Sequence, residues 1–229
     1  MIFPTNGVYA KIVLCDLGPR FVLKKSQTLI SRTVRAGANC EITLSGNNFE
    51  PLDSVRDLGV INDSELSMRV HLSKISTTCF LHLRRLRKLR PLIDTASAQR
   101  LALTFILSRV DNCNAVLSGL PTSTLAALQR VLNAAARFVA GATSRTQVSG
   151  IMKSLHWLSI AYRIRFKLCV LMHGVHNGTS PSYLTDTTTP ISSLPGHRQL
   201  RSAMTTEYDI PRTRTKFGDR AFSVAGPRE

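Results

Sequence analysis

The strongest constraint on the fold is a set of apolar residues that recur at three- and four-residue steps, or multiples of these steps, through the middle of the chain. This spacing places side chains on one face of an α-helix, which turns once in about 3.6 residues. The three longest stripes are Leu72, Ile75, Leu83, Leu86 and Leu89; Ala98, Leu101, Ala102 and Phe105; and Leu125, Leu128, Val131, Leu132, Ala135, Phe138 and Val139. Stripes on consecutive helices with short connections bury against one another, so the sequence predicts a mainly α fold, a helical bundle.

Local signals predict where these helices begin and end. The expected N-caps are Ser64, Thr95 and either Thr122 or Ser123, and the expected stops are Pro91 and Gly141. The second helix is expected to reach about Val110. Shorter helices are predicted over 149–155 and 159–175, with one helical turn at 180–186.

The flanking segments differ in character from the helical part. Residues 1–40 have weak periodicity and are expected to form a divergent, poorly structured segment. Residues 41–64 predict a short β-hairpin, with one strand in 41–46 and the other in 54–63. The helical domain is expected to span 65–186. Residues 187–229 are rich in Thr, Ser, Pro and Arg, which favours an irregular, extended basic tail.

The charge of the chain is strongly one-sided. Thirty Lys and Arg residues stand against 14 acids, giving a formal charge of +16. Between residues 66 and 185 the only acids are Asp94 and Asp111. This excess indicates a polyanionic partner, with a merely solvated basic surface as the alternative. A membrane surface is disfavoured, because the apolar stripes have one another as packing partners.

Five cysteines with no close repeated spacing favour reduced thiols and an intracellular protein of the nucleus or cytoplasm. We find no signal peptide and no uncharged apolar run of membrane-spanning length. Cys169, His173 and His176 have a spacing possible for zinc, and so do Cys79 and His82. The paired C-x2-C or H-x3-H motifs of a typical zinc site are missing. The preferred interpretation is therefore that the cysteines are buried thiols and the histidines lie on the surface.

No motif for catalysis is evident. The G-x-S-x-G, phosphate-loop and dinucleotide patterns are absent, and no two acids are adjacent. Asp53, Asp57 and Asp63 are the densest acidic set. Two-metal phosphoryl transfer needs clustered carboxylates, so this chain alone is not expected to form a polymerase or nuclease centre.

The segment 155–168, LHWLSIAYRIRFKL, contains the only Trp. We expect Trp157 to anchor a packed turn and His156 to hydrogen-bond at the edge of the core. In the helix that follows, Tyr162, Phe166 and Cys169 are expected to face inward. Arg163 and Lys167 are then expected to face outward, with Arg165 to one side.

From Val55 to the end, the chain resembles the region after the polymerase core in reverse transcriptases of non-LTR retrotransposons, of the LINE-type, jockey-like group. The resemblance rests on blocks in a fixed order: VRDLGVINDSELSM (55–68), LRRLRKLR (83–90), VDNCNAVLSGLP (110–121), LQRVLNAAARFVAG (128–141), LHWLSIAYRIRFKL (155–168), SPSYLTD (180–186), LRSA (200–203) and FGDRAFSVAGP (217–227). It implies a thumb-like fragment, truncated at both ends, whose hairpin would be the last edge of the palm.

In that family the palm carries an F/Y-x-D-D turn, which this chain lacks. No catalytic residue is therefore transferred, and the fragment is expected to be inactive alone. The full-length enzyme would use Mg, and no cofactor is expected here.

A thumb grips an RNA–DNA or DNA duplex through phosphates. The foremost candidate contacts are Arg84, Arg85, Arg87, Lys88 and Arg90, and the second set is Arg163, Arg165 and Lys167. Neither a membrane nor a small-molecule partner is expected. The alternatives are a stand-alone nucleic-acid-binding module and a purely structural or protein-binding helical domain.

Overall fold

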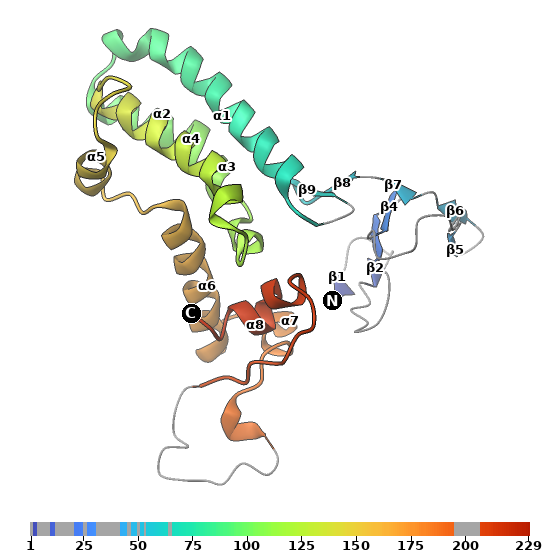
Figure 1. Cartoon of the computed structure of the whole chain (residues 1–229). Coiled ribbons are helices and arrows are strands. Elements are labelled where there is room, and N and C mark those ends of the chain that lie inside the picture. Colours follow the sequence, from blue (N-terminus) through green and yellow to red (C-terminus); the bar gives the residue numbers. More distant parts are fainter. Residues whose placement is uncertain are drawn as a thin grey trace. The chain divides into compact units, whose positions relative to one another are not determined.

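The computed structural model describes residues 54–63, 66–194 and 207–229 in full, together with the backbone of short strands within residues 2–52 (Figure 1). The chain divides into two compact units, Met1–His71 and Leu72–Glu229. Helices dominate the described residues, and a short antiparallel hairpin precedes them. The predicted mainly α fold is therefore confirmed.

The first unit contains small antiparallel pairs. Its strands are β1 (Ile2–Phe3), β2 (Ala10–Lys11), β3 (Phe21–Lys24), β4 (Gln27–Ile30), β5 (Ile42–Leu44), β6 (Asn47–Phe49), β7 (Pro51–Leu52), β8 (Ser54–Asp57) and β9 (Val60–Asp63). β1 pairs with β2, β3 with β4, β5 with β6 and β8 with β9, all antiparallel, while β7 joins β4 in parallel.

The hairpin differs from the expected one in its pairing. Residues 54–63 were predicted as a single strand opposite 41–46, but they form both strands of a hairpin, with Asp57 opposite Val60. The reason is the two-residue turn, in which Leu58 has φ 46° and Gly59 has φ 89°. Positive φ at both central positions matches the twist of the flanking strands and closes the hairpin tightly.

The first long helix begins later than predicted. α1 spans Arg69–Leu89, and the expected cap, Ser64, lies outside the described residues. The Asp63 carboxylate accepts from the Ser67 backbone N–H at 2.6 Å and from the Ser67 hydroxyl at 2.7 Å. Leu66 and Met68 both have positive φ, so the chain turns sharply here before it becomes helical.

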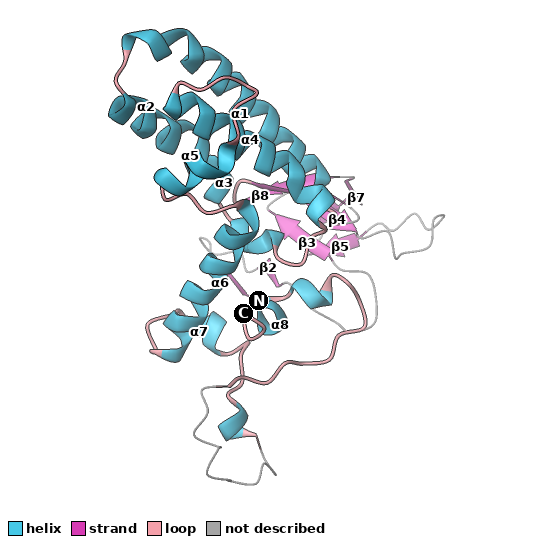
Figure 2. Cartoon of the chain, turned by 60° about the vertical axis from the view of Figure 1, so that its left-hand side comes forward, coloured by secondary structure: helices cyan, strands magenta, loops and turns pink. Residues whose placement is uncertain are grey.

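Figure 2 shows that the second unit consists almost entirely of helices and loops. After α1 come η1 (Arg90–Leu92), α2 (Thr95–Ala102), η2 (Leu103–Leu107), α3 (Ser108–Asp111), η3 (Asn114–Leu117), α4 (Thr122–Ala140), α5 (Val148–Ser154), α6 (Ile160–His176), α7 (Ser182–Thr185), η4 (Ile191–Ser193), η6 (Gly218–Arg220) and α8 (Phe222–Ala225). α2, η2 and α3 form one continuous helical segment, interrupted by the π-helical turn η2.

α4 is the centre of the bundle. It contacts α2, η2, α5 and α6, and α1 lies alongside it in both views (Figures 1 and 2). Its predicted stripe is confirmed from Leu128 onward, since Leu128, Val131, Leu132, Ala135, Phe138 and Val139 are all buried. Burying one such Val or Leu side chain contributes about 1.5–3 kcal/mol, so α4 supplies much of the core.

The predicted helix stops and starts are correct to within a few residues. Gly141 has φ 63° and ends α4, with the Ala142 N–H donating to the Arg137 carbonyl at 2.9 Å. This is the glycine-terminated ending that the sequence predicted. The cap of α2 is Asp94 rather than Thr95, because the Asp94 carboxylate accepts from the Ser97 N–H at 3.2 Å. The predicted cap of α4, Thr122 or Ser123, is wrong as well, because the N-cap residue is Pro121 and no side chain caps the helix.

The C-terminal segment is irregular, as predicted, but it is not an extended arm over its described part. Pro190 pairs with Tyr208, and the Asp209 N–H donates to the Thr189 carbonyl at 2.8 Å. Val224 in α8 is fully buried. The residues after α8 approach α6 closely, since a Cβ on Gly226 would lie 2.7 Å from the Met172 sulfur.

Candidate nucleic-acid interface

α1 has one buried face and one cationic face. Its buried residues in the helical unit are Leu72, Ser76, Cys79, Leu83 and Leu86. Alternating steps of four and three keep this set on one side of the helix. Leu89, which the stripe had included, is 47% exposed, and Ile75 is only half-buried. The opposite side of α1, which includes Lys74, Thr77 and Leu81, is exposed.

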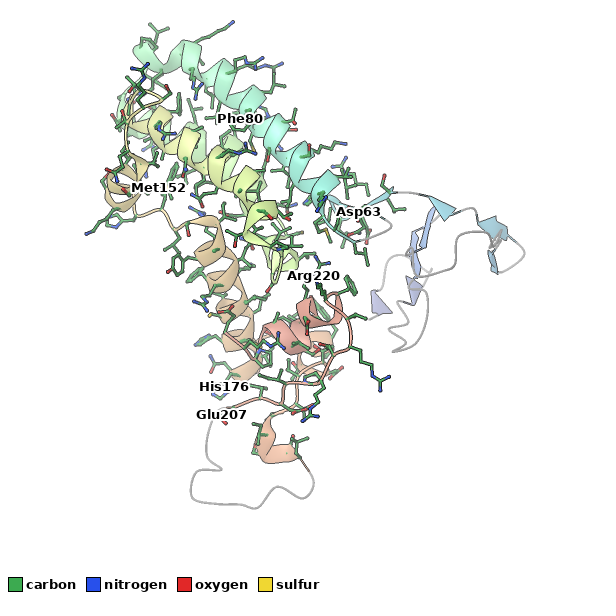
Figure 3. The ribbon with its side chains drawn as sticks, viewed as in Figure 1. Asp63, Phe80, Met152, His176, Glu207 and Arg220 are labelled. Atoms are coloured by element: carbon green, nitrogen blue, oxygen red, sulfur yellow. The ribbon has the colours of Figure 1, made fainter. Side chains whose placement is uncertain are left out.

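Four of the foremost predicted contacts occupy that outer side. Arg84, Arg85, Arg87 and Lys88 are exposed, and among the described residues of the helical unit they make no hydrogen bond or ion pair. Phe80, labelled in Figure 3, lies one turn before Arg84 and is 40% exposed. The C-terminal half of α1 thus presents a surface of four cations, which we call the α1 cationic face.

The two acids between residues 66 and 185 are both engaged elsewhere. The Asp94 carboxylate caps α2, and its hydrogen bond with Ser97 lowers the pKa of Asp94. Asp111 accepts from Arg163 at 2.7 Å. Neither carboxylate therefore neutralises the α1 cationic face through a contact among the described residues.

Arg90, the fifth residue of that set, has a different role from the predicted one. Its Nε donates to the Phe138 carbonyl at 2.9 Å, its Nη2 to the Val139 carbonyl at 3.0 Å, and its Nη1 to the Ile93 carbonyl at 2.9 Å. The last carbonyls of a helix lack partners within it, and a cation there also complements the helix dipole. Arg90 therefore closes the end of α4 rather than facing a phosphate.

Two residues of the second predicted set also have partners within the chain. Arg163 was expected to face outward, but its side chain is only 15% exposed and pairs with Asp111. Its Nε donates to the Leu158 carbonyl at 2.9 Å. Arg165 is exposed and pairs with Glu229, and this hydrogen bond raises the pKa of Arg165. Lys167 is exposed, as predicted.

The buried face of α6 is the reverse of the predicted one. Tyr162 and Phe166 were expected to face inward but are 59% and 61% exposed, and Cys169 is exposed as well. Ile160, Ile164, Leu168 and Val175 are buried in their place. Helix α6 is apolar on two sides, and the packing of α4 and η3 selects the side with the aliphatic residues.

In the turn before α6, the prediction for Trp157 is confirmed and the prediction for His156 is wrong. Trp157 is buried, as expected, and its backbone N–H donates to the Met152 carbonyl at 2.9 Å. His156 is exposed rather than at the core edge, because it takes the left-handed position that ends α5, with φ 54°. The left-handed backbone of His156 turns the chain between α5 and α6, and this turn does not depend on a hydrogen bond from the His156 side chain.

A hollow lies at the C-terminal end of α6, against the residues around Tyr208 and Gly226. Its lining includes His173, His176, Glu207, Asp209 and Glu229, of which His176 and Glu207 are labelled in Figure 3. Three carboxylates disfavour a phosphate ligand in this hollow. Among the described residues, no three His, Cys, Asp or Glu side chains are gathered as ligands for a metal ion.

Within the described part of the chain, no helix combines the length and apolar character needed to cross a membrane. Comparison of the chain with protein-family models, curated proteins and solved structures yields no match. The fold and the site therefore define a mainly helical protein with an acid-poor cationic helix face.

Proposed function

We propose that the helical unit binds the phosphates of duplex nucleic acid through the α1 cationic face, as the thumb-like region of a LINE-type reverse transcriptase does for its primer–template. The observation that carries the proposal is that Arg84, Arg85, Arg87 and Lys88 are exposed together and lack acidic partners among the described residues. The order of sequence blocks from Val55 onward supports the thumb-like assignment.

Helix stability alone does not account for this cluster. Arg84 with Lys88, and Arg85 with Lys88, are like charges at four- and three-residue spacing, and each such pair destabilises a helix by about 0.2–0.5 kcal/mol. Arg87 and Lys88 lie in the last turn, where the helix dipole favours cations. Arg84 and Arg85 precede that turn, so a polyanionic ligand explains their placement better than the dipole does.

The cluster suits phosphate binding without base readout. Arg84 and Lys88 lie one turn apart, about 6 Å along the helix axis, and long cationic side chains from adjacent turns reach neighbouring phosphates of one strand. Such contacts position a duplex without reading its sequence. We therefore expect affinity for RNA–DNA and DNA duplexes with little sequence preference.

The proposal assigns no catalytic step to this chain. Of the densest acidic set, Asp63 is engaged with Ser67, and Asp53 lies outside the described residues. Asp57 is half-buried in β8. A primer-extension assay on the purified chain with magnesium should give no product, and magnesium-dependent extension would contradict this part of the proposal.

Fluorescence anisotropy with a labelled RNA–DNA duplex tests the binding itself. The account predicts binding at low salt and a steady loss of affinity as salt rises, because each phosphate contact releases counterions. Absence of binding at low salt, or an affinity that does not change with salt, would refute the proposal.

A further inference from the structure

α6 carries a second apolar stripe, on the side away from its buried face. The stripe begins at Leu158, just before the helix, and continues inside the helix with Tyr162, Phe166 and Val170 at four-residue steps. All four are well exposed, and Phe166 and Tyr162 are more exposed than any other aromatic side chain among the described residues. Four-residue steps within the helix place Tyr162, Phe166 and Val170 above one another on one side, so this part of the stripe extends about 12 Å along the helix.

Core packing does not require this stripe. The helix already packs through Ile160, Ile164 and Leu168, which are buried. Its first turn is fixed to α4, because the Ile160 N–H donates to the Gln129 side-chain oxygen at 3.0 Å. Two exposed aromatic side chains are therefore held on a positioned helix.

The surroundings of the rings are cationic. Lys167 follows Phe166 and is exposed, and residues 112–185 contain no Asp or Glu. Two acids from other segments reach this helix, Asp111 through its ion pair with Arg163 and Glu229 through its ion pair with Arg165, and Lys167 has no acidic partner among the described residues. A surface that combines exposed aromatic rings with cations, in a chain of net charge +16, complements a ligand that combines flat bases with phosphates.

We propose that Tyr162 and Phe166 form a stacking platform for the bases of a single-stranded nucleic acid, with Lys167 contacting a neighbouring phosphate. Every base has a π-face, so such a platform tolerates any sequence. The inference rests on the proposed nucleic-acid binding of the helical unit and adds a second ligand form, the single strand, on a helix other than α1.

The test measures binding of the full chain to an oligothymidylate and, in parallel, to an RNA–DNA duplex. Tyr162→Ala and Phe166→Ala should each weaken single-strand binding about 10-fold and leave duplex binding within about twofold. Phe166→Trp should retain single-strand binding and show fluorescence quenching on binding, because the native Trp157 is buried. Leu92→Ala, at an apolar residue that is 81% exposed in η1, is the matched surface control and should change neither affinity.

Phe166→Leu separates base stacking from docking of an apolar protein surface. Leucine keeps an apolar side chain but has no ring, so the platform predicts a loss close to that of Phe166→Ala. Single-strand affinity that is unchanged in Phe166→Leu, or in both alanine variants, would overturn the inference. Duplex binding that persists in that case would leave the proposed function standing, whereas a chain that binds neither probe refutes both.

Discussion

The guanidinium of Arg90 donates to the main-chain carbonyl of Phe138 at 2.9 Å and so joins the end of α1 to the end of α4. Two further N–H groups of Arg90 donate to the carbonyls of Val139 and Ile93. One side chain of a strongly cationic segment therefore serves the fold, while its neighbours Arg87 and Lys88 face outward. Mutations in LRRLRKLR should separate these two roles.

Replacing Arg90 should reduce stability without specifically weakening nucleic-acid binding. Arg90→Met leaves helix-end carbonyls without donors, and we expect a loss of about 2–3 kcal/mol in the free energy of unfolding. Arg85→Met, at an exposed position of the same helix, should change stability by less than about 0.5 kcal/mol. Urea denaturation of both variants measures the difference, and equal stabilities would contradict the role given to Arg90.

Two glycine-to-alanine substitutions should change stability in opposite directions. Gly141 has φ 63° at the end of α4, and we expect Gly141→Ala to cost about 1 kcal/mol because a Cβ is strained in the left-handed region. Gly150 lies inside α5 with no atom within 4 Å of an added Cβ, so Gly150→Ala should stabilise by about 0.5–1 kcal/mol. Thermal unfolding of the pair checks the signs, and a stabilising Gly141→Ala would show that α4 does not end as described.

The contact between the hairpin and the start of α1 should weaken in acid. The Ile61 N–H donates to Nδ1 of His71 at 3.3 Å, and burial lowers the pKa of His71 below its usual 6.5. Because the folded state resists protonation, its stability is full above pH 6.5 and falls as the pH drops through 6.5 toward the lowered folded-state pKa. A protonated ring would also place a second donor opposite the Ile61 N–H.

Hydrogen exchange of the Ile61 amide measures this effect. Protection, corrected for intrinsic exchange, should fall on acidification in the native chain. In His71→Asn, whose side-chain oxygen still accepts and does not titrate, protection should stay constant over the same range. An identical acid-induced loss in both proteins would rule out His71 as its source.

Cysteine reactivity should follow burial. Burial raises the pKa of the Cys79 thiol to about 11, with Arg109 acting weakly in the other direction, while Cys113 and Cys169 are exposed. Only the thiolate is nucleophilic, so iodoacetamide at about pH 8 should modify Cys113 and Cys169 well before Cys79. Peptide mass spectrometry reads the order, and early labelling of Cys79 would mean that the inner face of α1 opens readily.

Helical periodicity predicted the existence of the long helices, because α4 has a single continuous apolar stripe and a glycine at its end. It could not choose the buried face of α6, where both Ile160–Ile164–Leu168 and Tyr162–Phe166 have four-residue spacing. That choice depends on tertiary contacts with α4 and η3, which the local pattern does not encode.

The sequence could predict the candidate site as a cluster of cations, but not the role of each cation in it. The sequence located the cations of LRRLRKLR, and the polyanionic partner that the acid-poor segment favours stays a prediction. The separate roles of Arg90 and Arg163 depend on carbonyls and a carboxylate about 50 residues away in the chain, Phe138 and Asp111. Sequence spacing cannot reveal such long-range partners.

The salt dependence of duplex binding tests the central claim most directly. The slope of log affinity against log salt should fall in magnitude by about two units in Arg84→Gln/Arg87→Gln, at about 0.9 for each lost phosphate contact. The control Arg145→Gln/Lys153→Gln removes the same charge from exposed positions outside α1 and should keep a slope close to the native one. Equal slopes in the two double variants, or a native slope in the α1 variant, would contradict duplex binding through the α1 cationic face.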